Sequence, residues 1–248
     1  MKSKISLLTI AVIISIAFSS CKKDNQDQSS SGPSALNLKM EALNTTVSLP
    51  VQENGLKSAT SNATISWDSA YMLVSRIKFE AEIESQVHHR DSVEIEYSWR
   101  GPLMLNLLDP SSVIGTITLP EGTYDKISLK VMSEREDANG QPLFFLSGNY
   151  NDSLGVVTPI VVSVTDPIAF KTDQTDDTIA TGTSIDYTST IQLYLDQLFL
   201  NIDPATLSSA TLTNGVLVIS ATSNKKIYHF ILHNLGHNHK CHHEHHHH

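Results

Sequence analysis

Residues 77–84 read IKFEAEIE and residues 93–100 read VEIEYSWR, and these two stretches decide the fold class. In each, an apolar residue alternates with a charged or polar one. Successive side chains of a strand point to opposite faces, so each stretch places one face on a core and the other in water. Residues 126–131 (KISLKV) repeat the pattern. The alternation predicts that these side chains face the core: Ile77, Phe79, Val93, Ile95, Tyr97, Ile127, Leu129 and Val131.

Short strand candidates continue along the rest of the chain. They cover residues 103–108, 113–119, 143–150, 156–165, 188–200 and 216–221. The dipeptides Asn139-Gly140 and Asn214-Gly215 are typical of tight turns. No strand alternates with a long amphipathic helix, which argues against an α/β fold. The sequence therefore predicts an all-β fold, an antiparallel β-sandwich, with a barrel as the alternative architecture.

One helix is expected close to the C-terminus, over residues 224–236. Asn224 is a candidate N-cap and Gly236 a candidate stop. Between them, apolar residues recur at helical spacing and form one stripe. The stripe consists of Ile227, Phe230, Ile231 and Leu235.

The first residues have the organisation of an export signal. Lys2 and Lys4 precede an apolar run over residues 5–18, which is too short to span a bilayer comfortably. The following residues, 18–21 (FSSC), resemble the lipobox of bacterial lipoproteins, in which small residues precede an invariant cysteine. The resemblance implies that residues 1–20 are a signal peptide and that Cys21 carries the lipid. An ordinary secretory signal followed by a free cysteine is the alternative.

Composition and charge narrow the class of partner. The formal net charge is −9, and loss of Lys2 and Lys4 with the signal makes it −11. Such an acidic chain is a poor partner for nucleic acid. If Cys21 carries lipid, Cys241 is the only other cysteine and no internal disulfide can form.

The expected organisation follows from these segments. It comprises a signal peptide (1–20), a polar flexible tether (21–35), a β-sandwich domain (36–223), a short C-terminal helix (224–236) and a disordered His-rich tail (237–248). The alternative is that residues 36–223 form two sub-domains, with the boundary near residues 135–142.

Four segments of the chain carry a family resemblance. Residues 105–109 (LNLLD) and 119–127 (LPEGTYDKI) resemble a leucine-rich strand and a Leu-Pro-x-Gly-x-Tyr turn. Both recur in a group of gram-negative, Bacteroidota-type surface lipoproteins with a prealbumin-like β-sandwich. Residues 195–199 (LDQLF) and the C-terminal helix are similar to the same type of lipoprotein. The resemblance implies a β-sandwich at the outer membrane and does not supply a reaction.

The C-terminus is the segment in which residues that can bind metal concentrate. Ten of the twelve histidines lie in residues 229–248. Imidazole is the preferred ligand type for Zn, Ni and Cu ions, and a thiolate adds a softer ligand. His229 and His233 are i and i+4 on the expected helix, so they are neighbours on its surface. An expression tag, an inert solubilising tail and a solvated helix face are the competing interpretations. The candidate ligands are His229, His233, His237, His239, Cys241, His242, His243, His245, His246, His247 and His248.

Other candidate sites are weaker. Residues 88–91 (HHRD) are expected at a hairpin tip, and an acidic loop with Asp173, Asp176 and Asp177 lacks the spacing and the glycine of an EF-hand. Four short segments resemble the O-glycosylation sequon of Bacteroidota-type bacteria: residues 68–70, 91–93, 152–154 and 177–179.

No nucleophile elbow, P-loop or dinucleotide fingerprint is present in the sequence, so we expect no enzyme activity. The leading hypothesis is a lipid-anchored outer-membrane protein that captures Zn, Ni or Cu ions with its C-terminus, alone or beside an envelope transporter. The alternative is an adhesin-like or structural module whose sandwich binds a protein or glycan partner. A carbohydrate-active enzyme is the third hypothesis.

Overall fold

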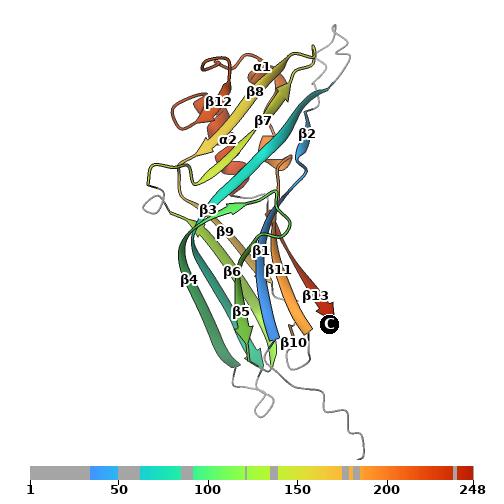
Figure 1. Ribbon diagram of the computed structural model, residues 1–248, viewed down its shortest axis with the longest axis vertical. Helices are drawn as coiled ribbons and strands as arrows, with labels where there is room; N and C mark the ends of the chain where they lie inside the picture. The colour runs from blue at the N-terminus through green and yellow to red at the C-terminus, as the bar shows by residue number, and fades with distance from the viewer. Residues whose placement is uncertain are drawn as a thin grey trace, which may run out of the picture.

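A computed structural model describes residues 34–49, 62–84, 92–120, 122–134, 139–174, 179–180, 185–236 and 239–247. These residues form two β-sheets and three short helical segments, arranged as an elongated molecule (Figure 1). One sheet has four strands in the order β13-β11-β1-β5, and the other contains nine. The predicted all-β class is confirmed.

Strand β3 (Ala63–Glu84) connects the two halves of the larger sheet, because its 22 residues run through both the upper and the lower half of the molecule in Figure 1. Its first half pairs with β2 (Thr46–Leu49) and β7 (Phe144–Asn151). Its second half pairs with β4 (Ser92–Asn106) and β6 (Thr123–Ser133). The register shifts between Val74 and Arg76, where the two halves meet on the β4 side.

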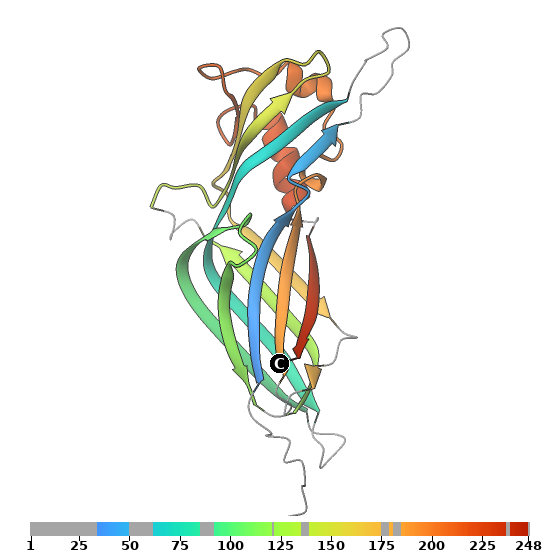
Figure 2. The ribbon, with the colours of Figure 1, turned by 45° about the vertical axis from the view of Figure 1, so that its right-hand side comes forward.

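The lower half in Figure 1 is a two-layer sandwich. One layer is the four-stranded sheet, formed by β1 (Ser34–Leu43), β5 (Val113–Leu119), β11 (Ile185–Tyr194) and β13 (His239–His247). The other layer is β4, the second half of β3, β6, β9 (Ile168–Gln174) and β10 (Ile179–Ala180). Figure 2, turned by 45°, shows the two layers facing each other. Large side chains such as Leu38, Phe79 and Leu129 fill the space between them and are at most 1% exposed.

The upper half carries the helices on one face of its sheet (Figures 1 and 2). This sheet continues from β3 through β7 and β8 (Val157–Val164) to β12 (Leu217–Ser220). The helical segments are η2 (Gln197–Phe199), α1 (Pro204–Ser208) and α2 (Lys225–Leu235). The ring of Phe199 in η2 lies 5.8 Å from the ring of Trp67 in β3, which fixes the segment after β11 on the sheet.

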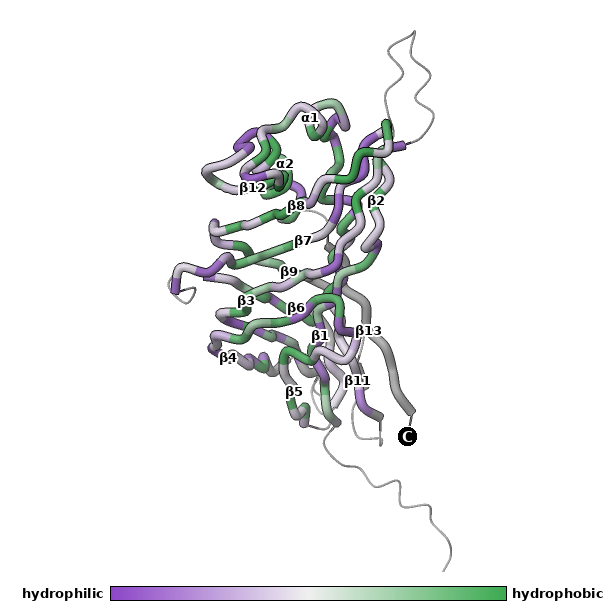
Figure 3. The backbone as a smooth tube through the Cα atoms, turned by 45° about the horizontal axis from the view of Figure 1, so that its top comes forward, coloured by the Kyte–Doolittle hydropathy of each residue, from purple (hydrophilic) through white to green (hydrophobic). Residues whose placement is uncertain are grey.

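The alternation of β3, β4 and β6 can be followed in Figure 3 and accounts for most of the core. Ile77, Phe79, Ile127, Leu129 and Val131 are buried as predicted, each with at most 2% exposure. The inward side chains of β4 are less covered than the alternation alone suggested: Ile95 and Tyr97 are only partly buried. Among the described strands β4 pairs only with β3, so it is an edge strand with a neighbour on one side. The side chain of Val93 lies outside the described residues.

Three features differ from the expected strand layout. The pairs β1–β11 and β8–β12 are parallel, so the sheets are mixed rather than purely antiparallel. Strand β1 begins at Ser34, inside the stretch expected to be a tether. The strand candidate over residues 188–200 ends at Tyr194 and turns into η2. By contrast, Asn139-Gly140 and Asn214-Gly215 adopt positive φ at both residues, as their turn chemistry predicted.

The C-terminal tail differs most from the prediction. Instead of being disordered, residues 239–247 form β13, which pairs antiparallel with β11. Composition predicted disorder because so polar a segment cannot bury apolar surface. Backbone pairing does not require apolar side chains, however, and an edge strand offers a row of unpaired N–H and C=O groups. The free edge of β11 therefore provides the backbone hydrogen bonds through which the polar tail forms a strand.

Candidate metal centre and neighbouring pockets

Helix α2 positions the two histidines that the sequence singled out. It spans Lys225–Leu235, within a residue of the predicted bounds at each end. Asn224 occupies the N-cap position with φ 51°, but its side chain makes no capping hydrogen bond. Its Nδ2 instead donates to the carbonyl oxygens of Thr211 and Val218, at 2.9 and 2.8 Å. Asn224 therefore ties the start of the helix to β12 and to the preceding loop.

The buried face of α2 holds the helix against the upper sheet. Ile227, Tyr228, Ile231, Asn234 and Leu235 are buried. Asn234 Nδ2 donates to the carbonyl oxygens of residues 198 and 200, each at 3.0 Å. The Tyr228 hydroxyl donates to a carboxylate oxygen of residue 166 at 2.7 Å. Burial, reinforced by this hydrogen bond, raises the pKa of Tyr228.

The prediction that Phe230 belongs to the buried apolar stripe is wrong, since this residue is 40% exposed. The buried stripe is centred on Ile231, with Ile227 and Leu235 one turn before and after it. Phe230 lies about 100° around the helix from Ile231, and Tyr228 and Asn234 complete the stripe in its place. Phe230 therefore faces outward, beside the histidines.

His229 and His233 are both exposed and line one pocket of about 500 Å³ together with Lys226, Phe230 and residues 201 and 234. Residues i and i+4 of a helix are surface neighbours, so the two imidazoles can approach one ion. The His229 ring also stands edge-on to Tyr228, with 5.8 Å between the ring centres. The pair supplies two nitrogen ligands, and the ammonium group of Lys226 in the same pocket opposes a cation.

The tail histidines are described by their backbone only. Across the β11–β13 ladder, Cys241 lies opposite Ile191 and His247 opposite Ile185. His237 and His248, and the side chains of residues 239–247, lie outside the described part of the chain. Within the side chains that the structure describes, no group of three or more His, Cys, Asp or Glu residues comes together. The described part of the candidate metal centre is therefore the pair on α2.

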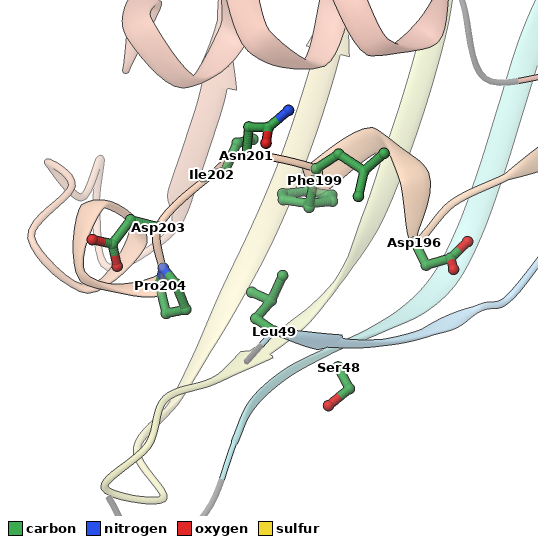
Figure 4. Close-up of a pocket in the computed structure, with 9 residues that line it drawn as sticks. Ser48, Leu49, Asp196, Phe199, Asn201, Ile202, Asp203 and Pro204 are labelled. Carbon is green, nitrogen blue, oxygen red and sulfur yellow. The ribbon is translucent and has the colours of Figure 1, made fainter. Parts of the chain in front are cut away.

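A second pocket, of about 430 Å³, lies between β2 and the segment that follows β11. Figure 4 shows Leu49 and Phe199 in its middle and Asp196 and Asp203 at opposite ends. Both carboxylates have structural partners: Asp196 accepts from Asn44 Nδ2 at 2.9 Å, and Asp203 accepts from the N–H of residue 205, capping α1. No pattern in the sequence indicates this pocket, because its walls come from segments about 150 residues apart.

The remaining candidates are only partly placed. Cys21, residues 88–91, Asp176 and Asp177 lie outside the described residues, and Asp173 is described in β9 without its side chain. Of the glycosylation-like segments, residues 68–70 are inside β3, whereas residues 152–154 form the turn between β7 and β8.

Comparison with known proteins gave no match: no family model, no curated protein and no solved structure is similar to this chain. Within the described residues, no helix has the length and apolar character needed to cross a bilayer.

Proposed function

We propose that this chain is a non-catalytic lipoprotein of the cell envelope, anchored in the outer membrane through Cys21, that binds Zn, Ni or Cu ions through its His-rich C-terminus. The observation that supports the proposal best is the pair His229 and His233, exposed on one face of α2 and lining the same pocket. The pair lies a few residues before the segment in which the other candidate ligands concentrate. The Bacteroidota-type lipoprotein family suggested by the sequence is consistent with this location.

The pairing of the tail limits how it can bind metal. A strand of nine residues extends over about 30 Å, so the ends of β13 cannot both reach one ion. An ion held by three or four tail histidines therefore requires β13 to leave β11. When β13 leaves, its backbone hydrogen bonds to β11 are lost and the backbone groups of β11 are exposed. The free energy of this loss lowers the affinity of the tail for metal compared with a preformed zinc site. We therefore expect binding to start at the helical pair and nearby residues, and further ions to be taken up as β13 is released.

Titration calorimetry on the full chain with Zn²⁺, Ni²⁺ and Cu²⁺ tests the proposal. Cu²⁺ should bind most tightly, and binding should be lost as the pH falls through about 6, where imidazole becomes protonated. A chain ending at Leu235 should lose most sites, and His229→Ala with His233→Ala in that shorter chain should remove the rest. Substituting His88 and His89, the two histidines outside this region, is the matched control. Equal titrations of the full and shortened chains would refute binding by the tail.

A second candidate function is an adhesin-like interaction module, and the β7–β8 turn favours it. Leu154 is 86% exposed, and Val156 and Val157 beside it are 57% and 61% exposed. The turn is preorganised, because Asp152 Oδ1 accepts from the N–H groups of Leu154 and Val156 at 2.9 and 2.8 Å, and Gly155 takes φ 82°. Rigid display of apolar side chains lowers the entropy cost of binding.

This second function predicts that Leu154→Asp abolishes adhesion of cells that carry the protein while leaving its melting temperature unchanged. Leu212→Asp, at another exposed leucine, is the control. Unchanged adhesion of the Leu154→Asp variant would remove this candidate.

A further inference from the structure

Strand β4 has one backbone edge with no neighbour among the described strands. It pairs only with β3, and Figures 1 and 2 both show it as the outermost ribbon of its layer. An edge strand presents a row of backbone N–H and C=O groups that can pair with a further strand. The ladder cannot continue far beyond Arg100, because Pro102 has no N–H and the register with β3 shifts there. The segment open to a new partner is therefore residues 94–100 (EIEYSWR).

The inward side chains of this segment are apolar and incompletely covered. Ile95, Tyr97 and Trp99 pack against the core but are only partly buried. The three residues opposite them in β3 are at most 1% exposed. The exposure of the β4 side chains therefore arises on the side where β4 has no neighbouring strand. A further strand on that side would remove this apolar surface from water, which is favourable.

The outward side chains of the segment carry charges that face like charges in β3. Glu94 is opposite Glu82, and Arg100 is opposite Arg76, which also has Glu134 at 3.7 Å. Like charges directly across a ladder are destabilising, whereas opposite charges stabilise it. A new strand would therefore be favoured if it placed a cation opposite Glu94 and a carboxylate opposite Arg100.

A second copy of the same segment meets this requirement. Glu94 and Arg100 lie three residues before and three residues after Tyr97. In an antiparallel pair with twofold symmetry about Tyr97, Glu94 of each copy is opposite Arg100 of the other. Glu96 is then opposite Ser98, so no like charges meet across the new ladder. The twofold axis thus joins the acidic end of one segment to the basic end of the other.

The same register suits the apolar face. It places Ile95 opposite Trp99 of the other copy, and Tyr97 opposite its own copy. Directly opposite residues of a ladder lie on the same face of the sheet, so these side chains all remain on the core side. Pairs of an aromatic and a β-branched residue, and pairs of aromatics, are among the stabilising cross-strand pairs. Charge and apolar packing therefore favour one register.

The neighbouring symmetric registers are poorer. Symmetry about Glu96 places this carboxylate opposite its own copy, which is a like-charge pair. Symmetry about Ser98 brings Pro102 into the ladder opposite Glu94, where the missing N–H removes a hydrogen bond. A shift by a single residue places apolar side chains opposite charged ones, on the wrong face.

We propose that two copies of this chain associate edge to edge through β4, in an antiparallel ladder of residues 94–100 centred on Tyr97. The larger sheets of the two copies then continue into each other. A second copy is the occupant because the charges of the segment match those of the same segment reversed. The proposal does not depend on the histidines of α2, on metal binding or on a lipid anchor.

The test measures the dimer dissociation constant of the purified full chain by analytical ultracentrifugation. A metal chelator prevents ions from bridging the histidines of two copies, and about 50 mM salt leaves exposed charges little screened. A ladder this short is smaller than a standard interface, so the dissociation constant should be about 1 µM or weaker. Glu94→Arg and Arg100→Glu should each raise it at least about 10-fold, because both intermolecular charge pairs become repulsive.

An equimolar mixture of the Glu94→Arg and Arg100→Glu variants should recover the dimer, because each intermolecular pair then joins an arginine to a glutamate. Association through any other part of the chain is common to all variants and would not follow this pattern. In dilute solution neither variant should melt lower than the original chain, because each turns a like-charge pair with β3 into an attractive one. A loss of the dimer is then not a loss of the fold.

Lys225→Glu is the matched control for Arg100→Glu, because it makes the same change in net charge on exposed α2. It should change the dissociation constant less than about twofold, because it lies on another element. The proposal is overturned if the original chain stays monomeric up to about 1 mM, the concentration at which even weak pairing is detectable. It is also overturned if either single variant dimerises as well as the original chain, or if the mixture does not recover the dimer.

Discussion

Replacing Lys130 by Glu should make the protein more stable. Lys130 has a lysine directly opposite on each side, Lys78 in β3 and Lys171 in β9. The substitution turns two repulsive cross-strand pairs into two attractive ones. Directly opposed pairs contribute about 0.2–1 kcal/mol each, and at an exposed surface the lower part of that range applies. The diagonal position of Glu80 offsets a smaller part of the gain.

We therefore expect the free energy of unfolding to rise by about 1 kcal/mol, or about 2–4 °C in melting temperature for a chain of this size. Calorimetry or urea unfolding at low salt measures the effect, and Lys130→Gln should give about half of it. In 1 M salt the gain should largely disappear, because exposed charges are then screened over about 3 Å. A Lys130→Glu protein that is no more stable than the original, or a gain that salt leaves unchanged, would refute the inference that the lysine row carries a cost.

Three further predictions concern packing and pH. Gly148→Ala should unfold much of the upper sheet or cost more than about 3 kcal/mol, since a Cβ there would lie 2.0 Å from the backbone oxygen of Ser66; urea unfolding checks this. Asn234→Ala should destabilise by about 1–3 kcal/mol, because a buried carbonyl oxygen of residue 198 and a partly buried one of residue 200 lose their donor. The exposed Phe230→Ala should cost less than about 1 kcal/mol in the same assay. Burial raises the pKa of Tyr228, so this tyrosine ionises in the unfolded chain before it does in the folded one as the pH rises above about 10. The contribution of Tyr228 to the free energy of unfolding should therefore be constant below that pH and fall above it. In melting temperatures measured from pH 7 to 11, Tyr228→Phe should weaken this fall.

The sequence by itself determined the local features of the fold. Alternation in residues 77–84 and 126–131 identified core side chains, because the period of two follows from strand geometry alone. The turns at Asn139-Gly140 and Asn214-Gly215 followed from the few residues that tolerate positive φ. The bounds of α2 followed from periodicity and from Gly236. Each of these signals lies within about a dozen residues of chain.

Tertiary structure decided everything that depends on which segments become neighbours. The partial exposure of Ile95 follows from the edge position of β4, and pattern within one strand carries no information about its place in a sheet. The exposure of Phe230 follows from which part of α2 meets η2 and β12. The tail became a strand because β11, about 50 residues earlier, has a free edge.

The candidate sites divide in the same way. Histidine spacing predicted the pair on α2, since i and i+4 on a helix are neighbours in any helix. The row formed by Lys78, Lys130 and Lys171 could not be predicted, because the three residues come from three strands that only pairing register aligns. Register between distant strands is set by the packing of the whole core, and each lysine alone reads as an ordinary outward position of an alternating strand.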